Sequence, residues 1–508
     1  MLLAFSKRPS TQSGVFYFKR TKPKFIFGIF VLQIKFGLVV RIEKDSLGEL
    51  AIPDEAIYGV HSLRSLNNFP KSGERINPYL IKAFFQVKLA AAETNYKCGL
   101  LFKDKYDPIE EAIRELIIET DEFIKGNFDS IYEKIIVDPY QGGAGTSLNM
   151  NINEVIANTA LKIMEKDYGE YSTINPLDDV NLSQSTNDTF PTALRIASIL
   201  LLRELADSFA RLQNAFQKKE TEFRSVLKLG RTQFQDAVPI TLGQEFGAYA
   251  QAIARDRWRL YNAEERLRSV NLGGTAVGNS VSATKEYVQN VNSILKKITK
   301  LPIAKGEDLI DVTQNLDVFV EVHGLVKAGA TSIIKISNDL RFMSSGPNGG
   351  IGEINLPPKQ SGSSIMPGKV NPVICENAIQ IAELVKGNDV IISNLVSAGN
   401  LELNAFAPMI AHTFLKSLIM LRDSNLNLAE NCIEGITANV EHCKLNLLNS
   451  SAIAASLITT FGYETIQELV KYSYENKIPF VKALMKSKLL DEKELFNIIS
   501  TDLGINIE

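Results

Sequence analysis

The sequence predicts an all-α protein organised around a bundle of very long helices. Positions 192–229 contain no glycine or proline, and apolar residues recur there at three- and four-residue intervals. These apolar residues are Leu202, Leu205, Phe209, Leu212 and Phe216. Their spacing is typical of one helix face packed against neighbouring helices. Stretches of strict alternation between apolar and polar residues are scarce, which disfavours an extended β-sheet.

The helix predicted over 192–229 is long enough to indicate assembly. At about 1.5 Å per residue it would span about 57 Å, which exceeds a single small domain. Pro191 near its start and Gly230 after its end are residues that commonly bound helices. Positions 80–97 and 376–396 predict two further helices. Helices of this length usually bury against other subunits, so we expect an oligomer.

Composition and charge exclude several classes of protein. The chain has 508 residues, of which 45% are hydrophobic and 22% charged, and these globular averages exclude a disordered chain. Lysine plus arginine total 55 against 58 acidic residues, so there is no basic excess to bind nucleic acid. Four scattered cysteines without a CxxC pattern are typical of a reducing compartment, and we expect a cytoplasmic location. Four histidines without HExxH spacing do not predict a zinc site.

Residues 1–40 differ from the rest of the chain. They contain basic residues but no acidic one. The apolar run over 25–34 is about half as long as a membrane span requires, so we expect no membrane segment there. We interpret residues 1–40 as a non-native extension that results from a misplaced start codon. A targeting segment and a genuine additional arm are the alternatives.

Three polar segments between the predicted helices are unlike ordinary connectors. The segment QGGAGTSLNMN, at 141–151, has three glycines, so its backbone N–H groups can approach an anion closely. It lacks the GK[ST] of a P-loop and the GxGxxG of a dinucleotide site. The second segment is SQSTND at 183–188, and the third is GRTQFQDAVPITLGQE at 230–245. For SQSTND, plain capping of a helix is the alternative to a role in a functional site. The candidate residues of the three segments are Thr146, Ser185, Thr186, Asn187, Thr232 and Gln233.

The fourth segment, SGSSIMPGKVNP at 361–372, carries the densest set of reactive groups. Ser363 and Ser364 offer hydroxyls, Lys369 a fixed cation and Asn371 an amide. Such groups suit a small substrate rich in carboxylates. A serine without an adjacent histidine can act as a base if backbone N–H groups and a lysine stabilise its alkoxide. The residues by themselves therefore predict an α-helical enzyme that handles an anion, and leave its reaction open.

GSSIMPGKVNP, at 362–372, resembles the signature of the aspartase/fumarase superfamily, and the resemblance runs from about residue 41 to about residue 500. Supporting stretches include YGVHSLR at 58–64, NLGGTAVG at 271–278 and NDLRFMSSGP at 338–347. The resemblance implies a three-domain fold in a homotetramer, whose central domains form one multi-helix core. The implied boundaries are 41–184, 185–440 with the catalytic loop 361–372, and 441–508. Each active site would be assembled from three subunits.

The resemblance also implies a role for each candidate residue. Ser363 would be the general base, and Lys369 and Asn371, with Thr232 beside them, would hold the α-carboxylate of a substrate. Asn187 would face its amino group. The residues implied to bind the β-carboxylate are Thr146, Ser185, Thr186 and Ser364. Glu376 would steer Lys369 or relay a proton, although a carboxylate at a helix N-terminus is the simpler alternative.

The implied activity is the reversible anti-elimination of ammonia from L-aspartate to give fumarate. It needs no organic cofactor, and a divalent metal such as Mg²⁺ is expected only as an activator. Gln233 stands where fumarases, and some aspartases, carry a histidine, and glutamine is known at this position among aspartases, which favours this reaction over hydration. NPVICE, at 371–376, looks more like a fumarase, so hydration of fumarate to L-malate is the alternative. A non-catalytic helical structural protein is the remote alternative.

Overall fold

The computed structural model describes residues 39–127 and 131–504. Apart from Val39 and Val40, the predicted extension over 1–40 lies outside the described residues. The described residues form two compact units that divide between Ala56 and Ile57. In the first unit, β1 (Val40–Asp45) and β2 (Gly48–Pro53) form an antiparallel hairpin.

The second unit is helical, as the sequence predicts. Its first helices are α2 (Val60–Asn68), α3 (Pro78–Lys97), α4 (Lys103–Ile124), α5 (Ile131–Lys134) and α6 (Thr146–Ile163), followed by the π-helix η1 (Pro176–Val180). Its long helices are α7 (Thr186–Glu222), α8 (Leu242–Ala263), α11 (Asp317–Met343), α12 (Val373–Ser397) and α13 (Ala407–Asn431). Between them lie β3 (Leu227–Thr232), β4 (Gln235–Thr241), η2 (Glu264–Leu267), β5 (Ser269–Val270), α9 (Lys285–Thr299), β6 (Ala304–Lys305), α10 (Leu309–Gln314) and β7 (Ile354–Asn355). After α13 come η3 (Ile433–Gly435), β8 (Thr437–Ala438), α14 (Val440–Asn449), η4 (Ser451–Ile453), α15 (Ala454–Phe461), α16 (Tyr463–Asn476), α17 (Phe480–Ser487) and α18 (Glu492–Leu503).

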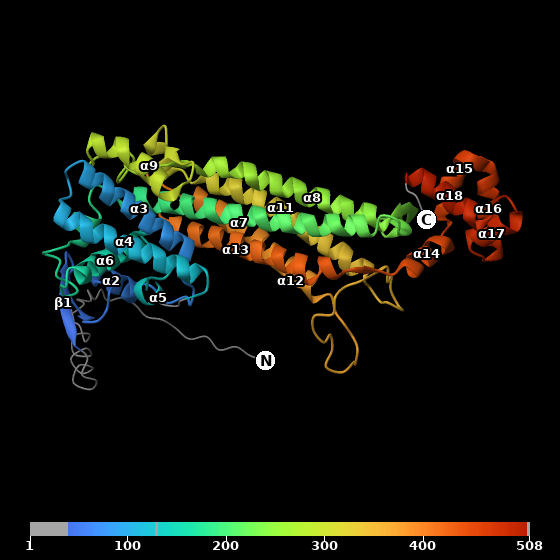
Figure 1. Ribbon diagram of the computed structural model, residues 1–508, viewed down its shortest axis with the longest axis horizontal. Helices are drawn as coiled ribbons and strands as arrows, with labels where there is room; N and C mark the ends of the chain where they lie inside the picture. The colour runs from blue at the N-terminus through green and yellow to red at the C-terminus, as the bar shows by residue number, and fades with distance from the viewer. Residues whose placement is uncertain (1–38, 128–130, 505–508) are drawn as a thin grey trace, which may run out of the picture. The chain divides into compact units, whose positions relative to one another are not determined.

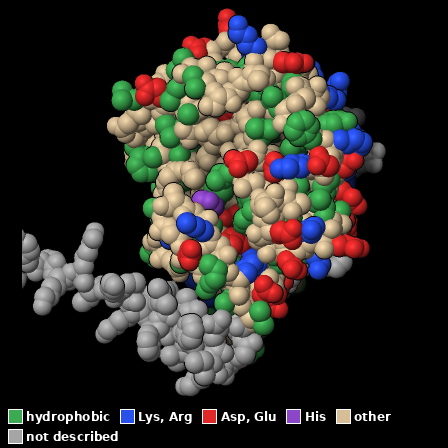
Figure 2. Space-filling view, turned by 90° about the vertical axis from the view of Figure 1, so that its left-hand side faces the viewer, with side chains coloured by type: hydrophobic (Ala, Val, Ile, Leu, Met, Phe, Trp, Pro, Cys, Tyr) green, Lys and Arg blue, Asp and Glu red, His purple; other side chains and the backbone are tan. Residues whose placement is uncertain are grey.

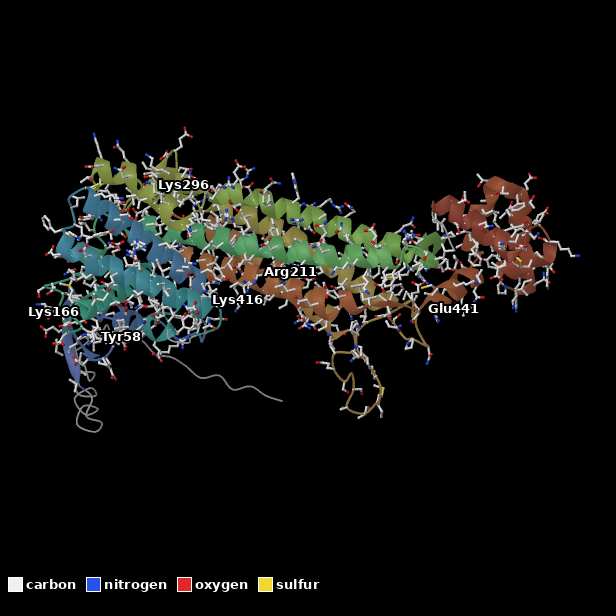
Figure 3. All side chains as sticks on the ribbon, in the orientation of Figure 1. Tyr58, Lys166, Arg211, Lys296, Lys416 and Glu441 are labelled. Atoms are coloured by element: carbon white, nitrogen blue, oxygen red, sulfur yellow. The ribbon has the colours of Figure 1, made fainter. Side chains whose placement is uncertain are left out.

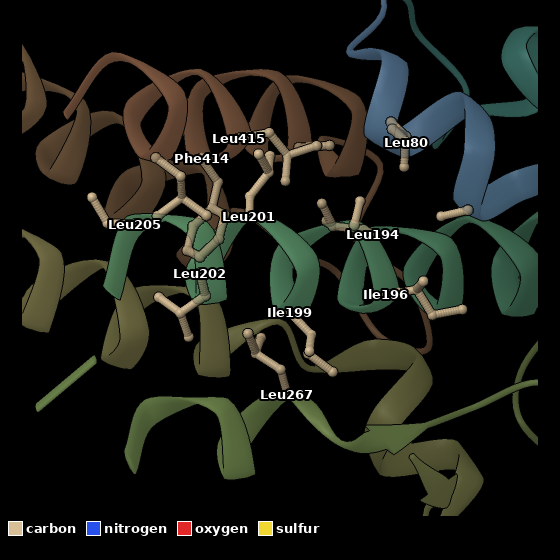
Figure 4. Packing of buried hydrophobic residues seen from close by; sticks show 14 of the residues in the cluster. Leu80, Leu194, Ile196, Ile199, Leu201, Leu202, Leu205, Leu267, Phe414 and Leu415 are labelled. Carbon is tan, nitrogen blue, oxygen red and sulfur yellow. The ribbon is translucent and has the colours of Figure 1, made fainter. Parts of the chain in front are cut away.

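The long helices lie side by side in one bundle (Figure 1), and α7 packs against α3, α8 and α13. The five apolar residues predicted to form a seam are buried in α7. Figure 4 shows Leu201 and Leu205 beside Phe414 and Leu415 of α13. Because a fully buried leucine side chain contributes about 1.5–3 kcal/mol, this seam is a major source of stability.

The helix predicted over 192–229 was wrong at both ends. It begins earlier, where Ser185 and Asp188 form a capping box, and Pro191 lies inside it. It ends at Glu222, because Leu227 and Leu229 instead belong to strand β3. These two leucines pack into a separate hydrophobic cluster with the helices after α13. The helices predicted over 80–97 and 376–396 are confirmed as α3 and α12.

The strands of the described residues are short and pair two by two. Hairpin β3–β4 follows α7, and β7 pairs with β8, which joins the segment before loop 361–372 to the segment after α13. No helix within the described residues is long and apolar enough to cross a membrane. On the face shown in Figure 2, acidic and basic side chains are intermingled.

Candidate active site

Two helix starts carry the first group of candidate residues, which we call the amino-terminal half-site: Thr146, Ser185, Thr186 and Asn187. Thr146 is the first residue of α6, and its hydroxyl donates to the carbonyl of Gly143 at 2.8 Å. Thr186 is the first residue of α7, and the Ser185 hydroxyl accepts from the N–H of Asn187 at 3.2 Å. Helix N-termini present unpaired N–H groups and a partial positive charge. This half-site therefore favours a carboxylate.

The starts of α6 and α7 lie next to each other. The side chains of Asn149 and Thr189, one turn into the two helices, are 3.3 Å apart. A Cβ atom at Gly145, just before α6, would lie 2.2 Å from the ring of Phe190 in α7. Only glycine allows this approach, and Gly145 has a φ of 98°, which also favours glycine. The sequence pattern of glycines before Thr146 thus serves close packing as well as anion access.

Asn187 has the geometry expected of a group that receives an ammonium. Its side-chain nitrogen donates to the carbonyl of Ala276 at 2.7 Å. Its side-chain oxygen accepts no hydrogen bond from any described residue and remains available as an acceptor. A substrate amino group is a donor, so this orientation suits the predicted role.

A buried carboxylate holds the backbone of the amino-terminal half-site in place. Asp188 is fully buried and accepts from the N–H groups of Ser185, Gly273 and Thr275 at 3.0–3.1 Å. It thereby ties the first turn of α7 to the NLGGTAVG segment. Burial raises the pKa of Asp188 to about 6, although these three N–H groups favour the ionised form.

Lys88 of α3 is a residue that the sequence analysis missed. It is fully buried, its ammonium donates to the side chain of Asn181 at 2.9 Å, and burial lowers its pKa to about 7. The side chains of Asn149 and Asn153 donate to the same oxygen of Asn181 at 3.1 Å. A lysine inside the apolar run FFQVKLAAA was the available signal, because lysine is almost never buried without a partner.

The second group, the carboxy-terminal half-site, comprises Thr232, Gln233, Ser363, Ser364, Lys369, Asn371 and Glu376. Thr232 pairs with Gln235, so Gln233 and Phe234 form the two-residue turn of hairpin β3–β4. Both turn residues have positive φ, 54° and 61°, as a type I′ turn requires. Gln233 is therefore exposed at the tip of the hairpin.

Buried ion pairs anchor this hairpin to the chain that leads into loop 361–372. Glu353 is fully buried and lies 2.8 Å from Arg231 and 2.9 Å from Lys228. At the tip, the ring of Phe234 packs edge-on against Phe342 with centroids 4.8 Å apart. Removing one partner of such a buried pair leaves an uncompensated charge, so Glu353 is important for the position of the hairpin.

Two hydrogen bonds join the two ends of loop 361–372, and we call this part the neck of the loop. The tip of the loop is exposed to solvent. The N–H of Gly362 donates to the carbonyl of Lys369, and the side chain of Asn371 donates to the carbonyl of Gly362, both at 2.8 Å. A Cβ atom at Gly362 would lie 2.6 Å from the Lys369 carbonyl oxygen, so glycine is required. Ile365 at the tip is 83% exposed. The neck holds Lys369 and Asn371 next to the start of α12.

Ser363 lies inside this loop with its hydroxyl oxygen already hydrogen-bonded. That oxygen accepts from the N–H of Ile365 at 3.2 Å and from the N–H of Met366 at 3.1 Å. Two N–H groups aimed at one oxygen favour its negatively charged form. The local geometry therefore suits a serine that gives up its proton and acts as a base. Ser364 next to it is exposed.

Some residues of the carboxy-terminal half-site line a cavity of about 630 Å³. Lys369, Asn371 and Glu376 line it, whereas Ser363 and Ser364 do not. Arg341, at the end of α11, also lines it, and its guanidinium lies 3.9 Å from the carboxylate of Glu376. Arg341 was missed as a candidate although it lies within the NDLRFMSSGP stretch that carries the resemblance.

The two half-sites lie at opposite ends of α7. This helix has 37 residues, which corresponds to roughly 55 Å at about 1.5 Å per residue. Figure 1 shows α6 at one end of the bundle and the segment that precedes α12 towards the other. Among the described residues, no hydrogen bond or ion pair joins the two groups. One chain therefore does not bring all the predicted residues together, and their roles stay predictions.

Metal-binding side chains are not clustered in the part of the chain that the structure describes. Within residues 39–127 and 131–504, no group of three or more His, Cys, Asp and Glu side chains could hold a metal ion. The four cysteines are free thiols.

Comparison with known proteins defines the class. Residues 48–387 match a lyase family, so the chain belongs to that family and, with the motifs above, to the aspartase/fumarase superfamily. It is 44% identical to an aspartate ammonia-lyase of a Bacillus species, over 91% of this chain and 96% of the other. It is 45% identical to the aspartate ammonia-lyase of Pseudomonas aeruginosa, over 90% and 95% of the two chains.

Solved structures agree with this assignment. The fumarate lyase/delta crystallin protein of Brucella melitensis bound to cobalt has a TM-score of 0.85 and 42% identity, over 91% of this chain and 98% of the other. The class II fumarase of Schistosoma mansoni has a TM-score of 0.83 and 29% identity, over 92% and 100%. The predicted all-α fold of this superfamily is thus confirmed, and the chain is a lyase.

Proposed function

We propose that this chain is an aspartate ammonia-lyase, which converts L-aspartate reversibly into fumarate and ammonia. The observation that carries the proposal is the Ser363 hydroxyl oxygen, which two backbone N–H groups hydrogen-bond within the loop that also presents Lys369. The curated relatives at 44% and 45% identity are aspartate ammonia-lyases, and they support the choice of substrate.

The proposed reaction begins with proton removal from the β-carbon. Ser363, as its alkoxide, takes the proton, and the electron pair of the C–H bond moves into the neighbouring β-carboxylate. That group becomes an aci-carboxylate dianion, which binds the four predicted donors more tightly than the substrate carboxylate does. Preferential binding of this intermediate lowers the barrier. The four donors are Thr146, Ser185, Thr186 and Ser364.

Loss of ammonia completes the proposed reaction. The electron pair of the dianion forms the carbon–carbon double bond, and the C–N bond breaks with its electrons leaving on nitrogen. The ammonium already carries its protons, so it departs as neutral ammonia without an added acid. Lys369 and Asn371 hold the α-carboxylate throughout, and the side-chain oxygen of Asn187 accepts from the amino group.

We propose further that the active chain is a homotetramer whose active sites combine half-sites from different subunits. The roughly 55 Å length of α7 supports this, because a four-carbon substrate is far too short to touch both of its ends. Large apolar side chains exposed on the long helices support it as well, since a neighbouring subunit would remove them from water. Examples are Trp258 at 68%, Tyr261 at 77% and Val390 at 59% exposure.

The proposal includes no organic cofactor, with Mg²⁺ as an activator only. Purified protein treated with EDTA should keep turning over L-aspartate, and added MgCl₂ should raise the rate. Complete loss of activity in EDTA would show that a metal is essential. A cytoplasmic location is proposed on the basis of the four free cysteines.

Hydration of fumarate is the second candidate, supported by the likeness to a class II fumarase at 29% identity. Gln233 argues against it, because an amide does not titrate and so cannot relay the proton that a departing hydroxide needs. The deciding experiment assays purified protein with L-aspartate and L-malate in parallel. We expect kcat/KM for aspartate to exceed that for malate by at least about 10³, on the order of 4 kcal/mol. Faster interconversion of malate and fumarate would overturn the proposal.

A further inference from the structure

One asparagine oxygen next to the amino-terminal half-site accepts three hydrogen bonds. It is the side-chain oxygen of Asn181, in the segment between η1 and α7. Lys88 of α3 donates to it at 2.9 Å, and Asn149 and Asn153 of α6 each donate to it at 3.1 Å. A carbonyl oxygen has two lone pairs, so three donors crowd around it. Asn181 therefore joins α3 and α6 to the segment that leads into α7.

The lysine among these three donors is buried, unlike most lysines. Lys166 and Lys296, which Figure 3 labels, have exposed side chains, whereas Lys88 is 0% exposed. Taking an ammonium out of water is costly, and lysine is almost never fully buried without a partner. The acceptor that Asn181 offers to Lys88 is therefore important for keeping this charge inside the protein.

Polar contacts continue from Asn181 to the starts of both helices of the half-site. Asn149 lies one turn into α6 from Thr146, and its side-chain oxygen is 3.3 Å from the Thr189 hydroxyl. The same hydroxyl lies 2.9 Å from the carbonyl of Ser185, the N-cap of α7. A continuous path of polar groups thus links Asn181 to the first turns of α6 and α7.

Asn181 is also tied directly to the residue before the N-cap of α7. Its side-chain nitrogen donates to the carbonyl of Gln184 at 3.2 Å, and the N–H of Gln184 donates to the carbonyl of Asn181 at 3.1 Å. Gln184 immediately precedes Ser185 in the sequence. The donor and the acceptor of one side chain therefore both help to fix where α7 begins.

We propose that Asn181 and Lys88 are positioning residues for the proposed lyase reaction, which hold the starts of α6 and α7 at the separation that the dianion requires. The inference rests on the proposed function, because it assigns Thr146 and Ser185 as donors to that dianion. Neither positioning residue contacts the reacting atoms. Fixed donors stabilise the intermediate more than the substrate carboxylate, so displaced donors slow the chemical step more than they weaken substrate binding.

A double-mutant cycle measured by steady-state kinetics tests the proposal. Lys88→Met and Asn181→Leu should each lower kcat for L-aspartate at least about tenfold, as loss of a hydrogen bond to a charged group predicts. KM should change less than about threefold, because the interactions that are lost act in the transition state. Since both substitutions remove the same hydrogen bond, kcat of the double variant should lie within about twofold of the lower single variant.

Asn425→Leu is the matched control. Asn425 is a 0% exposed asparagine of α13 that donates to the Ser208 hydroxyl at 3.2 Å, away from both half-sites. Its kcat should stay within about twofold of the unaltered chain, since residues without shared partners act independently. A loss as large as that of Asn181→Leu would show that any change of a buried asparagine slows the enzyme, and would overturn the positioning role.

Two further results would overturn this role: kcat of either single variant within about twofold of the unaltered chain, or losses that multiply in the double variant. If these variants do not fold, Thr189→Val decides, because it removes only the hydroxyl between Asn149 and Ser185. It should lower kcat at least about threefold at constant KM, and an unchanged kcat would overturn the role. An unaltered chain that turns over neither L-aspartate nor L-malate would instead overturn the proposed function itself.

Discussion

The amino-terminal half-site is held in place by buried groups, whereas the serine of the carboxy-terminal half-site lies in a loop attached only at its neck. Asp188 accepts three backbone N–H groups beneath the start of α7 and is fully buried. Ser363 is contacted by N–H groups of its own loop, and neighbouring Ile365 is 83% exposed. One end of the bundle is thus preorganised within the chain, and the other presents its reactive group outward.

This difference has a consequence for how the two ends contribute to the proposed reaction. Fixed N–H groups at helix N-termini stabilise a negative charge without any rearrangement of the protein. Binding of the dianion requires such fixed groups. A loop with free apolar side chains at its tip is suited to be covered by another subunit. We therefore expect substitutions at the two ends to differ in kind: those in the loop should affect the reaction only, and those beneath α7 should affect stability and its pH dependence as well.

The largest effect is expected from Ser363→Ala. Turnover of L-aspartate should fall by about 10²–10⁴-fold, because general-base catalysis typically contributes that much. Binding of a substrate-like dicarboxylate such as succinate should persist, since the remaining contacts are intact. Steady-state kinetics and succinate inhibition measure the two quantities. Lys369→Ala provides the contrast, because loss of the cation should weaken binding as well as rate. Near-normal turnover in Ser363→Ala would remove Ser363 from the base role.

Mixing two inactive variants tests whether the half-sites of one active site come from different chains. Ser363→Ala and Asn187→Ala, unfolded and refolded together in equal amounts, should recover roughly a quarter of the original activity by random assortment of subunits. Each variant refolded alone should stay inactive. If the mixture is no more active than its components, each active site uses both half-sites of a single chain.

Much of the fold could be predicted because helices leave a local signal. The apolar seam of α7 and the helices α3 and α12 follow from spacing alone. The end of α7 did not, because Leu227 and Leu229 are equally apolar in a helix or a strand. Whether these two leucines belong to a helix or to a strand depends on the hydrophobic cluster that they form with the helices after α13. Those helices lie more than two hundred residues away in sequence.

The sequence offers candidate site residues one by one, and their roles stay predictions. The polar loops point to Ser363, Lys369 and Asn371 as candidates, because the chemistry of their side chains is visible in the sequence. Lys88 and Arg341 were missed because their importance depends on burial and on a cavity that distant segments create. The separation of the half-sites also follows from geometry, since α7 holds their parts roughly 55 Å apart.

Lys88→Met should change how stability depends on pH. The pKa of Lys88 is lowered from 10.5 to about 7 in the folded chain, so the unfolded chain binds more protons between these values. Stability of the unaltered chain therefore gains from rising pH in that window, and the variant lacks this gain. The Tm difference, variant minus unaltered chain, should be greatest near pH 7 and shrink towards pH 9.

Differential scanning fluorimetry across that pH range measures this difference. Lys162→Met, an exposed lysine at the end of α6, serves as the matched control and should give a nearly constant difference. Constant or growing values for Lys88→Met would mean that Lys88 is not held in a buried environment that disfavours its charge.

The smallest effect is expected from Gln233→His at the tip of hairpin β3–β4. Histidine tolerates the positive φ of 54° at this position better than most residues, so the turn should be retained. An imidazole can relay a proton to a departing hydroxide, which the amide cannot, so a trace of malate–fumarate interconversion should appear. The gain in malate–fumarate interconversion should stay below about tenfold, because Asn187 and the amino-terminal half-site still select an ammonium.

Fumarate formation from L-malate and from L-aspartate, measured on the same preparation, gives the ratio of the two activities. A variant that handles malate as well as aspartate would show that Gln233 alone, and not the preorganised end of the bundle, determines the leaving group.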